Sequence, residues 1–252
     1  MTYFRVIVIV LSLLPLSVLA QSEVEFTADR PGATTSIDVL PKGRFQWETG
    51  VGYQHINMQG LKTYSWTLNT SLLRSGISDN AELRLQGDWS KMGGDIFSYN
   101  GPENVAIGTK VRMYDGWKFV PAVSLLGNVY VPSKHYDMMP NNWSGQIGLL
   151  FQNQLTSWLS LGYEGDISWL DNDDPFYFYG FCLGFTVSKR WQLMVEEYNN
   201  AYDQSTENWL ELGAMYKLSN RLQLDISTDI DLEEPKAFWN VSIGVAWQIT
   251  KK

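Results

Sequence analysis

The sequence has little of what many catalytic or nucleic-acid-binding proteins use. Its single cysteine, Cys182, cannot form an internal disulfide, and only two histidines are present. Beyond residue 20 no segment approaches roughly 18 uninterrupted apolar residues, which excludes a later membrane-spanning helix. Lys and Arg number 19 against 27 Asp and Glu. This acidic balance argues against a nucleic-acid partner, because neutralising phosphates needs clustered positive charge.

The first 20 residues have the layout of a secretory signal. Arg5 supplies the positive start, and an apolar run over residues 6–19 ends in the small-residue spacing of a cleavage site at Ala20. A membrane anchor is the alternative, but the run is shorter than the roughly 20 residues that a spanning helix needs, and Pro15 interrupts it. We expect residues 1–20 to be removed on export, which leaves one body of about 230 residues.

From residue 42 onward, apolar and polar residues alternate with the period of a β-strand. The segment 45–53 has one face of Phe45, Trp47, Thr49, Val51 and Tyr53 and another of Gln46, Glu48, Gly50 and Gly52. The next segment sets Tyr64, Trp66, Leu68, Thr70 and Leu72 against Ser65, Thr67, Asn69 and Ser71. Segments of this kind, about ten to thirteen residues long, are typical of strands that cross a membrane.

About twelve such segments follow one another. Short polar turns are expected at residues 78–80, 115–116, 155–157, 188–190 and 219–221. Longer connections rich in Gly, Asn, Asp and Pro are expected at residues 91–102, 131–141, 170–175, 200–207 and 231–236. This rhythm predicts an all-β protein, a closed antiparallel up-and-down transmembrane β-barrel of about 12 strands over residues 42–252.

A soluble β-sandwich or lipocalin-like barrel would alternate in the same way. Two features favour the membrane barrel. The charges keep to one face along long strands, whereas a dozen strands that packed their apolar face inward would need an oversized apolar interior. Tryptophans also lie near strand ends on the apolar face, as in the aromatic girdles of membrane barrels. Three tryptophans do not fit this girdle: Trp158 and Trp209 break the parity, and Trp66 is mid-strand.

The last strand resembles the terminal signal that the outer-membrane barrel assembly machinery recognises. Ser242, Gly244, Trp247 and Ile249 match its polar, glycine and two apolar positions, although residues 250–252 extend past the usual aromatic end. We therefore expect a location in the bacterial outer membrane with both mature termini periplasmic, and the assembly machinery and outer-membrane lipids as partners.

The polar face of the strands predicts a charged lumen. The candidate lining residues are Glu48, Glu82, Arg84, Asp88, Lys110, Arg112, Glu164, Asp166, Glu196, Asp225 and Asp229. Pairs such as Glu82 and Arg84 with Lys110 and Arg112 could form a salt-bridge network that fills a narrow barrel. Alternatively, the same charges set a field across a water-filled pore. The sequence leaves both alternatives open.

Residues 21–41 precede the first strand and show no alternation. They contain Asp29 and Arg30, and one reading is an amino-terminal segment that folds into the periplasmic mouth as a plug. Arg30 would then meet carboxylates such as Glu48 inside the barrel. The other reading is a loose leader before the first strand.

The chain opening resembles one known family. Its Asp29-Arg30-Pro31 entry, the Pro41-Lys42-Gly43 turn, the strand ending Glu48-Thr49-Gly50 and the later Gly108-Thr109-Lys110 are similar to the outer-membrane transporters named after the meta-pathway of phenol degradation. The resemblance implies a barrel that passes small, aromatic or apolar molecules across the outer membrane. A small-molecule solute is then the expected partner, and the resemblance brings no cofactor with it.

Other functions have weaker support in the sequence. Some barrels of similar size are lipid hydrolases, but no motif joins His55, or His135 after Ser133, to a nucleophile and an orienting partner. The acidic run over residues 171–174 could hold a hard cation, although a solvated loop has the same composition. A structural or adhesive barrel that uses its long loops for contacts remains a further alternative.

Overall fold

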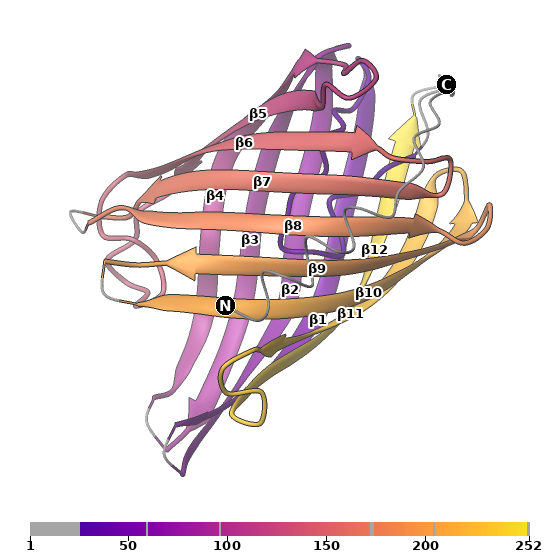
Figure 1. Cartoon of the computed structure of the whole chain (residues 1–252). Helices are drawn as coiled ribbons and strands as arrows, with labels where there is room; N and C mark the ends of the chain where they lie inside the picture. Colours follow the sequence, from indigo (N-terminus) through magenta and orange to yellow (C-terminus); the bar gives the residue numbers. More distant parts are fainter. Residues whose placement is uncertain (1–25, 59, 96, 172–173, 204, 251–252) are drawn as a thin grey trace.

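The computed structural model of the chain is a closed barrel of twelve antiparallel strands (Figure 1). It describes residues 26–250 except 59, 96, 172–173 and 204, so the expected signal over residues 1–20 and the start of the 21–41 segment lie outside the described residues. The strands are β1 (Arg44–Met58), β2 (Leu61–Ser78), β3 (Ala81–Gly94), β4 (Tyr99–Tyr114), β5 (Ala122–Tyr130), β6 (Ser144–Gln154), β7 (Leu159–Trp169), β8 (Phe176–Thr186), β9 (Trp191–Ala201), β10 (Thr206–Ser219), β11 (Leu222–Asp231) and β12 (Phe238–Thr250).

Each strand pairs with its sequence neighbours, and β1 pairs with β12 to close the barrel. The closing register runs from Arg44 opposite Thr250 to Ile56 opposite Phe238. Closure leaves no strand edge unpaired, which is what a sheet needs in a bilayer, where water cannot hydrogen-bond to the backbone. The expectation of an all-β, closed antiparallel barrel of about twelve strands is confirmed.

The alternation of the sequence becomes an apolar outside and a polar inside. Leu83, Ile107 and Ile243 are at least half exposed on the outer surface. Inside, Glu82 and Lys110 are fully buried although both carry charge. This polarity is opposite to that of a soluble barrel and suits a surface that faces lipid.

One β-bulge on β2 overturns part of the expected face assignment. An extra residue near Leu68 and Asn69 shifts the register against both β1 and β3. Uninterrupted alternation would place Thr70 on the apolar face, but its hydroxyl lies in the lumen and accepts a hydrogen bond from Arg30 at 2.8 Å. Asn69 and Ser71, which were expected inside, are bonded to each other on the outside at 3.0 Å.

The connections also depart from the expected lengths. Most of the expected loop over residues 91–102 is strand, because β3 continues to Gly94 and β4 begins at Tyr99. The turn expected at residues 115–116 extends to residue 121, because Trp117 and Val120 form a small bridge there. We call the end where β2 meets β3 and where β1 begins the turn end, and the opposite end the loop end.

The tryptophans follow the outer surface with one exception. Trp158 is 52% exposed, whereas Trp209 is only 7% exposed. Over the described part of the chain, no helix has the length and apolar character needed to cross a membrane.

Candidate functional site

Residues 26–43, which we call the entry segment, run through the barrel interior without forming a helix or strand (Figure 1). Their backbone N–H groups donate to carboxylates on four different strands. The pairs are Asp29 N and Arg30 N to Glu48 at 2.9 and 3.1 Å, Thr34 N to Glu196 at 2.6 Å, Thr35 N to Glu164, and Leu40 N to Glu82 at 2.7 Å. For these backbone N–H groups, carboxylates of the barrel thus replace the backbone carbonyl groups that would accept their hydrogen bonds in a sheet.

The carbonyl groups of the entry segment accept hydrogen bonds from side chains of the barrel. The donors are Gln46 to Thr27 at 2.9 Å, Lys110 to Ser36 at 2.6 Å, Ser124 to Ile37 at 2.7 Å, Arg74 to Asp38 at 2.7 Å and Gln223 to Arg30 at 3.0 Å. Phe26, Ile37 and Leu40 add apolar contact, since each is at most 5% exposed. The segment is therefore held by side chains and needs no strand pairing.

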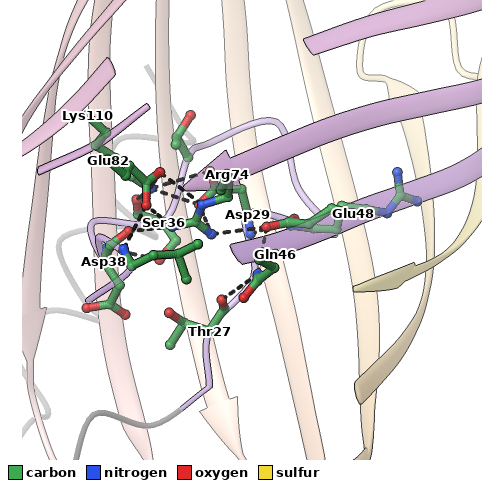
Figure 2. Close-up of polar contacts among 12 residues, drawn as sticks. Thr27, Asp29, Ser36, Asp38, Gln46, Glu48, Arg74, Glu82 and Lys110 are labelled. Atoms are coloured by element: carbon green, nitrogen blue, oxygen red, sulfur yellow. Dashed lines mark hydrogen bonds and ion pairs between the residues drawn. The ribbon is translucent and has the colours of Figure 1, made fainter. Parts of the chain in front are cut away.

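Six charged residues form the network that we call the β1–β4 cluster, and Figure 2 labels all of them except Arg84. Its members are Asp29, Glu48, Arg74, Glu82, Arg84 and Lys110. Arg74 is central, because its guanidinium lies 3.0 Å from Glu48 and 2.9 Å from Glu82. Asp29 reaches into the cluster from the entry segment and lies 2.5 Å from Arg84 and 3.0 Å from Lys110.

The β1–β4 cluster is electrically balanced only with the entry segment in place. It holds three cations, Arg74, Arg84 and Lys110, against three carboxylates, of which Asp29 is the only one outside the strands. Burial opposes ionisation of Asp29, but the positive charges of its three cationic partners outweigh it and hold the pKa of its carboxyl group below the usual range. Without Asp29 the buried cluster would carry one excess positive charge, which is costly away from water.

Arg30 points toward the part of the lumen wall formed by β11, β12, β1 and β2. Its guanidinium lies 3.1 Å from Asp225 on β11 and donates to Thr70 on β2 at 2.8 Å. Gly50 on β1 and Gly244 on β12 face each other in the sheet and form the hollow that receives it. A side-chain carbon on either glycine would collide with the guanidinium.

The wall formed by β7–β11, which Arg30 meets at Asp225, is acidic. Its buried carboxylates are Glu164 and Asp166 on β7, Glu196 on β9, Glu211 on β10, and Asp225 and Asp229 on β11. Asp29 and Arg30 therefore extend between a wall that contains the cations and a wall of carboxylates. The two charges of the segment match the two walls.

The structure places nine of the eleven expected lumen residues inside the barrel and buried. These are Glu48, Glu82, Arg84, Lys110, Glu164, Asp166, Glu196, Asp225 and Asp229. Asp88 and Arg112 are partly exposed. Asp88 accepts a hydrogen bond from Asn104 at 3.0 Å, and Arg112 lies 2.7 Å from Asp38 of the entry segment.

Two of these side chains have partners other than the examples expected. The Arg30 side chain pairs with Asp225, whereas Glu48 accepts from the Arg30 backbone N–H and pairs with Arg74. Arg112 takes no part in the network of Glu82, Arg84 and Lys110.

Arg74, the centre of the cluster, was not among the candidates, because alternation read through the β2 bulge places it on the apolar face. The extra residue near Leu68 turns it inward.

The expected assembly-signal residues divide between the two faces of β12. Trp247 and Ile249 are 47% and 40% exposed on the outer surface. Ser242 is hydrogen-bonded to Ser227 at 2.9 Å, and Gly244 borders Arg30. Recognition by the assembly machinery stays a prediction.

The residues weighed for enzyme or metal chemistry lie apart from this site. The His55 ring stacks on Trp239 with centroids 5.4 Å apart, and the His135 backbone N–H donates to the Ser133 hydroxyl at 3.4 Å. Asp171 accepts from the backbone N–H of Asn142 at 2.6 Å. Among the described residues no three His, Cys, Asp or Glu side chains are grouped to hold a metal ion.

Two cavities flank the entry segment. One, of about 420 Å³, is bordered by residues 30–33 and by strand positions toward the loop end, such as Gln54 and Asn200. The other, of about 200 Å³, is bordered by the opposite side of the segment and by positions toward the turn end, such as Gln152 and Gln192. The entry segment thus lies between an outer cavity and an inner cavity.

Comparison with known proteins supports the fold and identifies the family. No curated protein matches the sequence. An outer membrane channel from Pseudomonas putida F1 is similar, with 14% identity, a TM-score of 0.65 and coverage of 87% of this chain and 99% of that chain. The NanC porin has 10% identity, a TM-score of 0.56 and coverage of 81% and 100%. The translocator domain of the autotransporter NalP from Neisseria meningitidis has 16% identity, a TM-score of 0.50 and coverage of 84% and 90%.

These identities are low, so the structural likenesses show a shared barrel fold. The sequence itself matches a family model over residues 28–250, which includes the entry segment from Ala28 and nearly the whole barrel. The chain belongs to the family described as "Putative MetA-pathway of phenol degradation".

Proposed function

We propose that this protein is an outer-membrane channel for small solutes and that the entry segment closes its lumen in the conformation described here. The observation that carries the proposal is the position of Asp29 and Arg30, whose side chains form ion pairs inside the lumen with Arg84 on β3 and Asp225 on β11. The turn end would face the periplasm, because outer-membrane barrels have their short turns on that side.

The barrel wall does not depend on the entry segment. The β1–β12 pairing closes the sheet through backbone hydrogen bonds that begin at Arg44, after the segment ends. The segment itself is held by side-chain hydrogen bonds and ion pairs. A segment held in this way can leave and return while the wall stays intact, which is what a closing element requires.

A twelve-stranded barrel has room for a pore once the segment leaves. Barrels of about eight strands are filled by their own side chains, whereas those of about 16 strands leave an aqueous channel. With the segment displaced, the β1–β4 wall would keep Arg74, Arg84 and Lys110 beside Glu48 and Glu82, and the β7–β11 wall would keep its carboxylates. Opposed charges of this kind set a field across a hydrated pore and select among polar solutes.

The route to the membrane follows from the two ends of the sequence. Residues 1–20 would direct export, and the last strand would be recognised by the barrel assembly machinery, with outer-membrane lipids covering the apolar outer surface. The structurally similar channel and porin support transport over a purely structural or adhesive role, and an enzyme has no comparable support. The family resemblance implies small, aromatic or apolar solutes.

Planar-bilayer conductance tests this proposal. The variant carries Asp29→Asn and Arg30→Gln, which remove both charges; Asn keeps the size of Asp, and Gln is a shorter polar replacement for Arg. We expect wild type to open rarely and the variant to conduct steadily. The control carries Asp79→Asn and Arg221→Gln, the same exchanges at exposed turn positions, and should behave as wild type. A correctly folded test variant with wild-type conductance would overturn the closure, and the absence of any conductance in both would overturn the channel.

A further inference from the structure

The outer cavity, of about 420 Å³, is lined by aromatic and acidic side chains that the closure of the lumen does not require. It has the size of an ordinary small-molecule site, since such pockets range from about 300 to 1,000 Å³. Residues 30–33 form its floor, and strands β1, β2 and β9–β12 form its walls. A solute entering from the loop end would meet this cavity before it reached the entry segment.

Aromatic rings line one wall of the outer cavity. Trp209 on β10 and Tyr198 on β9 are paired across the sheet, and their rings stack with centroids 6.2 Å apart and planes at 4°. Phe178 on β8 continues the row, 6.1 Å from Tyr198. Trp209 is the tryptophan that turns away from lipid, with 7% exposure. A flat aromatic surface inside a polar lumen can stack with an apolar body or attract a cation.

A row of carboxylates lies directly beside the aromatic row. In the register of the sheet, Glu196 on β9 is opposite Glu211 on β10, and Glu211 is opposite Asp229 on β11. Each of the three is at most 7% exposed. Like charges directly opposite each other on neighbouring strands are destabilising unless a positive charge lies between them.

Positive charge at the cavity does not neutralise these carboxylates, because the cation in its lining, Arg30, is already paired with Asp225. Its ionisable lining groups are Glu207, Glu211, Asp229 and Arg30, and the Arg30 guanidinium lies 3.1 Å from Asp225.

Hydrogen bonds satisfy the row only in part. The Tyr198 hydroxyl donates to Asp229 at 2.7 Å, which joins the carboxylates to the aromatic row. Glu196 borders the inner cavity, and one of its oxygens accepts from Thr34. Glu211 and Asp229 are the carboxylates of the row that border the outer cavity.

We propose that the outer cavity binds a protonated organic amine with a flat apolar body. The ammonium group would lie between Glu211 and Asp229, and the body would stack on Tyr198 and Trp209. An anion of the same shape would be repelled by the carboxylates, and a neutral analogue would leave their charge unpaired. This inference rests on the proposed channel function and names the solute class that the channel would admit.

The test is amine binding to the full chain in detergent micelles, measured by isothermal titration calorimetry at pH 7. The probes are 2-phenylethylamine, its neutral analogue 2-phenylethanol and the anion phenylacetate. We expect the amine to bind at least tenfold more tightly than the alcohol, and the anion to show no saturable binding. Equal affinity for amine and alcohol in wild type would overturn the inference without any variant.

Variants locate the site. Asp229→Asn and Trp209→Leu should each weaken amine binding at least tenfold. If one of these variants does not fold, Glu211→Gln replaces it, with the same expected loss of affinity. The matched controls are Asp79→Asn at an exposed turn and Trp143→Leu, whose side chain is 67% exposed on the outer surface. Both controls should bind as wild type. Folded site variants that bind the amine like the controls would overturn the proposed location.

The conductance measurement separates this inference from the channel proposal. If the Asp29→Asn/Arg30→Gln variant conducts and wild type does not bind the amine, the solute class is wrong and the channel stands. If wild type binds the amine and the variant does not conduct, the site stands as a binding site in a barrel that is not a channel.

Discussion

Asp29 and Arg30 are neighbours in the chain, yet their side chains form ion pairs with strands that lie apart in the barrel wall. The Asp29 carboxylate lies 2.5 Å from Arg84 on β3, and the Arg30 guanidinium lies 3.1 Å from Asp225 on β11. Without Asp29 the β1–β4 cluster has one excess positive charge, and the β7–β11 wall holds an excess of carboxylates; both are costly in a dry interior. Two adjacent residues of opposite charge therefore compensate both walls at once.

The first prediction concerns the ion pair between Arg30 and Asp225. Arg30→Gln and Asp225→Asn should each raise the open probability in planar bilayers, and the double variant should open little more than either single variant. The reason is that the second substitution removes a contact already lost, so the two effects couple by about 0.5–3 kcal/mol. Strictly additive effects would contradict direct pairing in the closed state.

The hollow for Arg30 gives the second prediction. Gly50→Ala puts a carbon against the guanidinium, so we expect the entry segment to be displaced and conductance to rise. Gly127→Ala on β5 is the matched control, because nothing lies within 4 Å of the added carbon. The same conductance in both variants would show that Arg30 does not need this hollow.

Gly244 extends this comparison to membrane assembly, because it belongs to the expected assembly signal and also borders Arg30. If its main role is to receive Arg30, Gly244→Ala should raise conductance as Gly50→Ala does and leave the amount of barrel in the outer membrane unchanged. A loss of assembled protein in Gly244→Ala alone would assign the glycine to recognition by the assembly machinery.

Arg74 gives the third prediction. Its guanidinium is fully buried and bonds to both Glu48 and Glu82. Arg74→Met should lower the free energy of unfolding by about 3–5 kcal/mol, because it leaves buried carboxylates without their partner. Arg74→Lys should restore only part of this, since an ammonium group cannot bond bidentately to a carboxylate. Urea unfolding of the barrel in lipid vesicles measures both.

The control for Arg74 is Arg221→Met, at an exposed turn position, which should change the unfolding free energy little. Equal losses in the two variants would mean that Arg74 has no special role in the lumen.

The alternation of the sequence predicts the barrel, but it does not identify Arg74 as the centre of the charge network. Alternation fixes the face of a residue only while the strand stays regular, and one extra residue near Leu68 reverses the faces from there to Arg74. No local signal in the sequence marks that bulge, because Asn69 and Ser71 are polar enough to suit either face. The candidates on strands without a preceding bulge, such as Glu164 and Glu196, are buried in the lumen.

The partner of Arg30 was beyond the sequence for a different reason. Asp225 is 195 residues away in the chain, and the pairing depends on how far the entry segment extends into the lumen. Trp209 did give a signal, since it breaks the parity of the other tryptophans. The sequence does not show that Trp209 belongs to an aromatic surface beside buried carboxylates, because that placement depends on the register of β9–β11.

The outer surface gives the fourth prediction. Ile107 lies mid-way along β4 and is 57% exposed, whereas Met113 is near the turn end and is 62% exposed. If the barrel spans a bilayer, Ile107→Lys should cost about 2–4 kcal/mol of stability in lipid vesicles, and Met113→Lys about 0–1 kcal/mol. Equal costs would contradict a membrane whose centre lies near Ile107.

The native thiol gives the most direct test of closure by the entry segment. Thr34 of the segment and Cys182 on β8 both border the inner cavity. Thr34→Cys should therefore form a disulfide with Cys182 on oxidation in isolated outer membranes, and Thr34→Cys with Cys182→Ser should not.

The decisive measurement is the bilayer conductance of the Asp29→Asn/Arg30→Gln/Thr34→Cys variant before and after reduction. We expect a closed barrel while the disulfide holds the segment in the lumen and an open one after reduction. A failure to form the disulfide in a folded barrel, or equal conductance in both states, would contradict closure by residues 26–43.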